Sequence, residues 1–153
     1  MAFLLLLTGT VLILDQATKI LVFRLMPLHS VKEIIPGFFN LVHVHNTGAA
    51  FSMFAGAASF WRQLIFVGLA IVVVVGLMVA YVKLEKGDLA NRISYALIIS
   101  GAIGNLIDRV RLGEVIDFLD FYIGPYHWPA FNVADMGISV GAGIMLLTLL
   151  KRW

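Results

Sequence analysis

The sequence predicts an all-α membrane protein with four transmembrane helices, and its composition and hydropathy pattern are the reasons. Of 153 residues, 61% are hydrophobic and 13% are charged, whereas soluble domains are about half apolar and about a quarter charged. The mean hydropathy is +0.97. Long apolar stretches alternate with short polar ones. We therefore expect one integral-membrane domain over residues 1–153.

The first apolar stretch, Ala2 to Phe23, contains the polar residues Asp15, Gln16 and Lys19. A cleaved signal peptide is the alternative, but no basic region precedes the stretch and no small-x-small cleavage site follows it. Asp15 and Lys19 are four residues apart and can therefore pair on one helix face. We predict a membrane span in which these two residues have a supporting, structural role.

The three later stretches complete the predicted bundle. Leu64 to Val82 has 19 residues and no charge, which at about 1.5 Å per residue covers a hydrocarbon core of about 30 Å. Ile93 to Ile107 is shorter and rich in small residues, and Phe131 to Leu150 is apolar except near its start. Aromatic residues flank the spans, as is typical of the lipid interface.

Four spans place both termini and the 83–92 connection on one side, and connections 24–60 and 108–130 together on the other. Basic residues are equally frequent on both sides, but Lys151 and Arg152 directly follow a span and favour cytoplasmic termini. In the first connection, Phe38 to His45 is a β-prone run between turn signals, so we expect a short sheet there.

Two groups of polar residues are predicted to lie near the outer membrane face. Asn105, Asp108 and Arg109 share one helix face where the third span ends. A helix cap at the interface is the structural alternative for this group. Asn132 and Asp135 are one turn apart at the start of the fourth span, on the same side of the membrane.

Asp135 is the most informative of these residues. It lies in an apolar helix with no Lys or Arg three or four positions away, so a local salt bridge cannot neutralise it. A second carboxylate is one answer, because two close carboxyls share a proton and supply an acid and a base. By topology the partner is Asp117 or Asp120, and spacing does not choose between them. A hydrogen bond to a neighbouring helix is the alternative.

Other chemistries find little support. The chain has no cysteine, and His43 and His45 form no recognised metal motif. Lys19 as the base of a Ser–Lys hydrolase would leave the carboxylates unexplained. With 11 Lys and Arg and a net charge of +2, a nucleic-acid partner is not expected. We predict no metal and no cofactor.

Five sequence blocks in this order resemble the lipoprotein signal peptidase family, signal peptidase II, and the resemblance covers essentially the whole chain. The blocks are Asp15-Gln16-Ala17-Thr18-Lys19, Asn46-Thr47-Gly48-Ala49-Ala50-Phe51, Gly104-Asn105-Leu106-Ile107-Asp108-Arg109, Val115-Ile116-Asp117-Phe118 and Phe131-Asn132-Val133-Ala134-Asp135.

The resemblance implies an intramembrane aspartic protease that removes the signal peptide from a bacterial prolipoprotein, just before a diacylglyceryl-modified cysteine. It implies a catalytic dyad of Asp117 and Asp135, leaving Asp120 without a carried-over role. It also implies a small extracytoplasmic β-cradle and a short interfacial helix. The polar residues expected to line the site and hold the substrate are Asn46, Asn105, Arg109 and Asn132. Asp15 and Asp108 are expected to support them.

This interpretation implies an inner-membrane enzyme, a lipidated prolipoprotein substrate, contact with membrane lipid and a monomeric chain. The active site is expected near the extracytoplasmic face, covered by a mobile first loop for which Gly48 and Gly56 are candidate hinges. Two rivals remain: a proton-coupled transporter using Asp15, Lys19 and Asp135 as a relay, and a lipid-binding scaffold. The absence of repeated halves argues against a transporter.

Overall fold

The computed structural model describes residues 1–48, 59–85 and 87–151, and it contains four long helices and a small sheet. The helices are α1 (Ala2–Leu25), α2 (Ser59–Lys83), α3 (Leu89–Leu112) and α4 (Val133–Leu150). Each is long and apolar enough to cross a membrane. The prediction of four spans is confirmed.

All four helices differ in length from the apolar stretches that predicted them, and polar caps define ends of two of them, α3 and α4. The side chain of Asp88 accepts a hydrogen bond from the Asn91 backbone N–H at the start of α3, and Gly113 ends that helix with φ of 79°. At α4, Asn132 is the N-cap of a capping box with Asp135. The caps extend α3 beyond Ile93 to Ile107 and place Asn132 just before α4.

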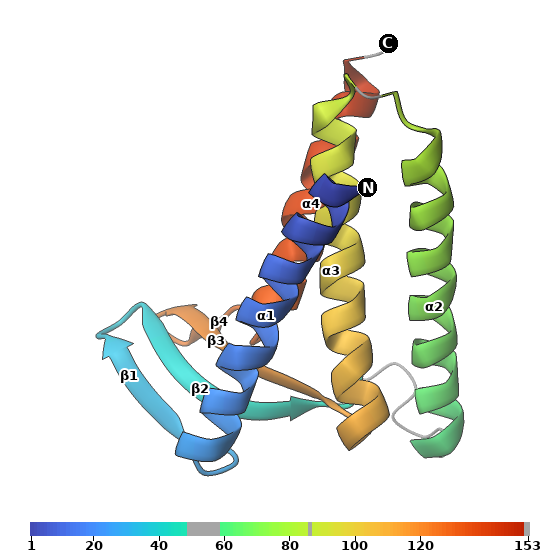
Figure 1. Cartoon of the computed structure of the whole chain (residues 1–153). Coiled ribbons are helices and arrows are strands. Elements are labelled where there is room, and N and C mark those ends of the chain that lie inside the picture. Colours follow the sequence, from blue (N-terminus) through green and yellow to red (C-terminus); the bar gives the residue numbers. More distant parts are fainter. Residues whose placement is uncertain (49–58, 86, 152–153) are drawn as a thin grey trace.

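Helix α3 is the centre of the bundle and packs against the three other helices (Figure 1). In its membrane window, 56% of the residues are buried, against 17% or less in the others. The small residues predicted to fill this span permit that close packing. At Gly104, an added Cβ would lie 2.6 Å from Asp15 Oδ2, so only glycine lets α1 bring this carboxylate against α3.

A four-stranded antiparallel sheet lies at one end of the bundle, and the start of α1 and the end of α4 lie at the other (Figure 1). Its strands, in spatial order, are β1 (Val31–Ile35), β2 (Phe39–Asn46), β3 (Val115–Ile123) and β4 (Tyr126–His127). The strand predicted at Phe38 to His45 is confirmed as β2. Strand β3 was not predicted, and its pairing with β2 joins the two outer connections.

The expected short interfacial helix is not among the described elements. Residues 49–58 of the first connection, which include the candidate hinge Gly56, lie outside the described residues.

Candidate functional site

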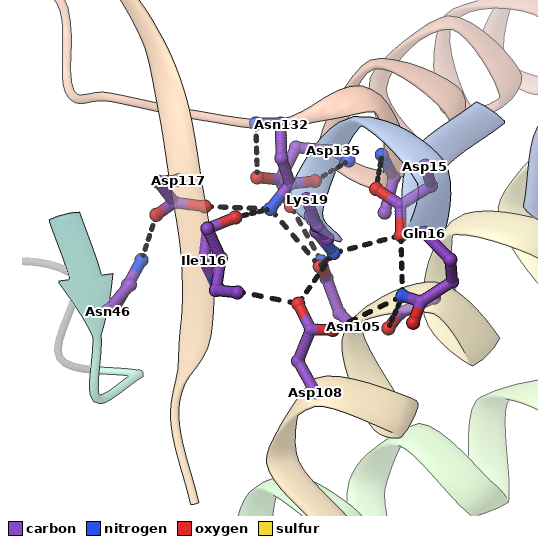
Figure 2. Close-up of polar contacts among 12 residues, drawn as sticks. Asp15, Gln16, Lys19, Asn46, Asn105, Asp108, Ile116, Asp117, Asn132 and Asp135 are labelled. Carbon is purple, nitrogen blue, oxygen red and sulfur yellow. Dashed lines mark hydrogen bonds and ion pairs between the residues drawn. The ribbon is translucent and has the colours of Figure 1, made fainter. Parts of the chain in front are cut away.

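The site lies where β3 passes the amino-terminal end of α4, at the sheet end of the bundle (Figures 1 and 2). Strand β3 carries Asp117 and the first turn of α4 carries Asp135. Figure 2 shows both carboxylates directed towards Asn132. Two acidic residues 18 positions apart in sequence are thus brought together around one buried amide.

Asn132 connects the two carboxylates directly. Its Nδ2 donates to Asp117 Oδ1 at 2.7 Å, its Oδ1 accepts from the Asp135 backbone N–H at 2.9 Å, and its own backbone N–H donates to Asp135 Oδ2 at 3.2 Å. The residue is fully buried. Because a buried amide with these bonds has little freedom to rotate, it fixes the two acids relative to each other.

Each carboxylate has a second amide donor from another element. Asn105 of α3 donates to Asp135 Oδ1 at 2.7 Å, and Asn46 at the end of β2 donates to Asp117 Oδ2 at 2.9 Å. Asn105 also accepts from Asn132 Nδ2 at 3.2 Å. Three of the asparagines predicted as site residues therefore touch the acid pair.

Asp117 is 2% exposed, and its burial raises the pKa of its carboxyl to about 7, with repulsion from Asp135 adding to the effect. The amides of Asn46 and Asn132, and the more distant charge of Lys19, act in the opposite direction and lower the same pKa. Since the raising effects win, one of the two acids retains a proton near neutral pH, as a general acid requires.

Beneath the pair, Lys19 sits in a buried network between α1 and α3 (Figure 2). Its Nζ lies 2.9 Å from Asp15 Oδ2, 2.8 Å from Asp108 Oδ2 and 3.0 Å from Asn105 Oδ1. The predicted Asp15–Lys19 pair is present, and the second carboxylate, Asp108, was not foreseen as a partner of this lysine. The network thus fixes Asn105, and Asn105 in turn holds Asp135.

Asp15 and Gln16 attach this network to neighbouring elements. Asp15 Oδ1 accepts from the Ala134 backbone N–H in the first turn of α4, at 2.9 Å. Gln16 Nε2 lies 3.1 Å from Asp15 Oδ2, 3.2 Å from the Gly104 carbonyl and 3.2 Å from Asp108 Oδ1. No role was predicted for Gln16 from the sequence, although an amide in an apolar span was the available signal.

Arg109 lies at the edge of the site. Its guanidinium carbon is 5.2 Å from the centre of the Phe66 ring on α2, and the charge is within electrostatic reach of Asp135 and Asp117. The Arg109 carbonyl accepts from Gln63 Nε2 at 2.8 Å. The side chain is therefore held beside the acid pair by α2, without a hydrogen bond to either acid among the contacts of the described residues.

Asp120 lies away from this centre. Its Oδ2 accepts from Asn40 Nδ2 at 2.9 Å, and its Oδ1 is 2.9 Å from His127 Nδ1. Asp117 and Asp120 are three positions apart on β3, and an odd spacing places side chains on opposite faces of a strand. Of the two candidate partners left open by the spacing, Asp117 is the one bonded to the network of Asp135.

Gly48 follows the site residue Asn46 and closes a turn on it. Its backbone N–H donates to Asn46 Oδ1 at 2.8 Å, and its φ is +91°. An added Cβ would lie 2.5 Å from the Phe66 ring. Only glycine combines this backbone conformation with this approach to α2, so Gly48 orients Asn46; the predicted hinge motion involves residues outside the described ones.

The four membrane-crossing helices and the buried polar network at one end define the class of the protein: a multi-pass membrane protein with a candidate acid–base site at the bundle's edge. A family model described as signal peptidase (SPase) II matches residues 7–151. The chain belongs to the signal peptidase II family, and it is a membrane peptidase.

Similar proteins and structures agree with this assignment. The lipoprotein signal peptidase of Syntrophus aciditrophicus is 46% identical over 94% of this chain and 89% of its own length. That of Tolumonas auensis is 51% identical over 89% of this chain and 82% of its own. A solved structure described as a bacterial membrane enzyme is 32% identical, covering 100% of this chain and 96% of its own with a TM-score of 0.89. These similarities favour an enzyme over the transporter and scaffold alternatives.

Proposed function

We propose that this peptidase removes the signal peptide from diacylglyceryl-modified prolipoproteins, cutting immediately before the lipidated cysteine, with Asp117 and Asp135 as its catalytic dyad. The observation that carries the proposal is the bonding of both carboxylates to the same buried residue, Asn132. The names of the relatives supply the substrate class.

In this mechanism Asp117 holds the shared proton and Asp135 is ionised. Asp135 accepts a proton from a water molecule as the water oxygen attacks the scissile carbonyl carbon, while Asp117 donates its proton to the carbonyl oxygen. The tetrahedral intermediate returns a hydroxyl proton to Asp117 and collapses. The proton on Asp135 passes to the leaving nitrogen as the C–N bond breaks, which restores the starting state without a covalent enzyme intermediate.

The neighbouring polar side chains have distinct proposed roles. Asn105 and Asn132 hold the acids, and Asn46 holds Asp117 from the strand side. Arg109, held beside the acid pair by the Phe66 ring, contacts the substrate backbone. The ion pairs of Lys19 with Asp15 and Asp108 support the acid pair through Asn105. Gly48 orients Asn46.

We also propose the orientation that suits this substrate. The sheet and the dyad lie near the extracytoplasmic face of the inner membrane, and both termini are cytoplasmic. A site at the lipid boundary admits the signal helix and the acyl chains laterally while the acyl chains stay in lipid. The enzyme acts as a monomer in contact with membrane lipid.

Cleavage of paired precursor peptides tests the proposed function. The purified protein in lipid, with EDTA present, is incubated with a prolipoprotein peptide carrying the diacylglyceryl cysteine and with the same peptide unmodified. Cleavage of the lipidated peptide alone, before the cysteine, supports the proposal. Equal cleavage of both peptides, or of neither, contradicts it.

We expect activity to fall as the pH rises through about 7, where the Asp117 carboxyl loses its proton. Above that pH both acids are ionised and no proton remains for the carbonyl oxygen, so the high-pH limb of kcat/KM reports this loss. Initial rates on the lipidated peptide between pH 5 and 9 measure it. A flat profile across this range would remove the raised carboxyl from the mechanism.

Arg109→Ala is expected to lower kcat/KM by about 10- to 100-fold, because a charged donor to the substrate backbone contributes about 1.5–3 kcal/mol. The matched control is Arg111→Ala, which removes the exposed arginine from the same last turn of α3. Peptide kinetics are measured at equal amounts of folded protein. Equal kinetics with lower expression for Arg109→Ala would instead indicate a helix-capping role.

A further inference from the structure

The end of β2 carries two histidines whose ring nitrogens face each other. His43 Nε2 lies 3.2 Å from His45 Nε2. His43 is 3% exposed, and the Phe23 ring of α1 packs on both imidazoles, edge-on to His43 and stacked on His45. His43 is therefore enclosed, whereas the side chain of His45 is 20% exposed, and the pair is not part of the acid network described above.

The partners of the other two ring nitrogens determine where protons sit. His43 Nδ1 is 2.8 Å from the Met26 carbonyl oxygen, which can only accept, so this nitrogen is the donor. His45 Nδ1 is 2.9 Å from Glu114 Oε2, and an ionised carboxylate also only accepts. Both Nδ1 atoms thus carry hydrogen, and if both rings were neutral their facing Nε2 atoms would both be bare.

Two bare nitrogens 3.2 Å apart repel each other, whereas one proton between them forms a hydrogen bond. The total number of protons is the same if Glu114 is protonated. If Glu114 donated a hydrogen to His45 Nδ1, His45 Nε2–H would donate to His43, and the three groups would again hold three protons in total. Because imidazole is more basic than a carboxylate, the extra proton resides on the rings.

We propose that His43 and His45 share one proton beyond those of two neutral rings, balanced by Glu114, and that this His–His–Glu relay is a positioning device that holds Asn46 on Asp117. The positioning role rests on the proposed function, because Asp117 is the acid that Asn46 contacts. The shared proton itself follows from the contacts of the relay alone.

The strand register links the relay to the site. His45 and Asn46 of β2 pair with Ile116 and Val115 of β3, and Glu114 immediately precedes β3. The His45–Glu114 contact therefore joins the two strands by their side chains at the position where Asn46 reaches Asp117. When the proton is lost at higher pH, the Nε2 atoms repel, and we expect His45 and the adjacent Asn46 to shift from β3.

A proton fits this pair better than a metal ion. Zinc sites use three or four protein ligands, and only two ring nitrogens converge here. Within residues 1–48, 59–85 and 87–151, no group of three or more His, Cys, Asp or Glu side chains is arranged to hold a metal ion.

Among the described residues, Glu114 is the acidic group that contacts the relay. Other charged groups line a cavity beside Phe23: Lys19 and Arg24 of α1, and Asp108 and Arg111 of α3. The backbone N–H of His29 donates to the His43 carbonyl oxygen at 2.7 Å. On the β3 side, His45 faces Ile116. Glu114 is thus the group whose removal alters the charge balance of the relay most directly.

Nitrogen NMR of imidazole-labelled protein in micelles tests the shared proton without reference to catalysis. At acid pH we expect both Nδ1 atoms protonated and a hydrogen bond between the Nε2 atoms. As the pH rises, one proton should leave the pair in a single step, and the side-chain amide signal of Asn46 should move with the same midpoint. EDTA should leave the spectra unchanged.

Glu114→Gln keeps an acceptor for His45 but removes the negative charge, so we expect the midpoint of this step to fall by about one pH unit or more. The matched control is His127→Gln, which removes another histidine bonded to a carboxylate, that of Asp120, but not facing a second imidazole. This control should leave the relay titration and the Asn46 signal unchanged.

Three results would overturn the inference: two independent histidine titrations, an Asn46 signal that ignores the step, or spectra that change when EDTA removes a metal. If the NMR signature is present but Asp117→Asn remains fully active, the relay stands and the proposed dyad fails. The two ideas are thereby separated.

Discussion

Asp117→Asn and Asp135→Asn are each expected to lower the rate of precursor cleavage by about 1,000-fold or more. Removing either carboxyl leaves an amide that cannot exchange the proton shared by the pair, so general acid–base catalysis is lost. The size of the side chain is kept, and each new amide has an oxygen that can still accept a hydrogen bond from a neighbouring asparagine. We therefore expect both variants to insert and fold normally.

The measurement is single-turnover cleavage of the lipidated peptide, with near-normal melting as the sign of folding. Asp120→Asn is the matched control, because it makes the same chemical change on the same strand but at a residue bonded to Asn40 and His127. This control should keep activity within a few-fold of the unaltered enzyme. Full activity in either dyad variant would refute the assignment of the catalytic acids.

The membrane spans could be predicted from sequence because the bilayer imposes a simple requirement. A helix that crosses it needs a long apolar segment, and the stretch Leu64 to Val82 has no other explanation. The ends of the helices were less predictable. Asn132 and Asp135 were expected at the start of the fourth span, but not as the capping box that they form there, because capping depends on backbone geometry that hydropathy does not contain.

Strand β3 was not predicted from the sequence. Without it, the choice between Asp117 and Asp120 as the partner of Asp135 stayed open. The run Val115–Ile123 is buried over most of its length, so it lacks the clean alternation that identifies a half-buried strand. Once the strand is known, the spacing of Asp117 and Asp120 separates them to opposite faces. The family resemblance supplied an assignment that local spacing did not.

The contacts around Lys19 could be predicted only in part. The pair with Asp15 follows from a spacing of four residues on one helix. The pair with Asp108 depends on how α1 packs against α3, and no local pattern encodes this. The same holds for Asn132, whose side-chain amide reaches both α3 and β3.

Lys19→Met is expected to destabilise the folded protein by about 3–5 kcal/mol, the cost of removing one partner from a buried ion pair. Lys19 is 1% exposed, Asp15 is fully buried and Asp108 is 2% exposed. Without the ammonium group, two carboxylates remain close together in a site from which water is excluded. Methionine fills similar space, so the loss reflects charge and not a cavity. Thermal unfolding in micelles should show a midpoint lower by roughly 10 °C.

The combination Asp15→Asn, Lys19→Met and Asp108→Asn separates the electrostatic explanation from a packing one. With the two acids neutral, no uncompensated charge remains, and we expect most of the lost stability to return. Lys32→Met, at an exposed position of β1, should leave the midpoint unchanged. A triple variant as unstable as Lys19→Met would contradict the electrostatic explanation. Recovery of stability without recovery of activity would show that this network orients Asn105, and through it Asp135, for catalysis.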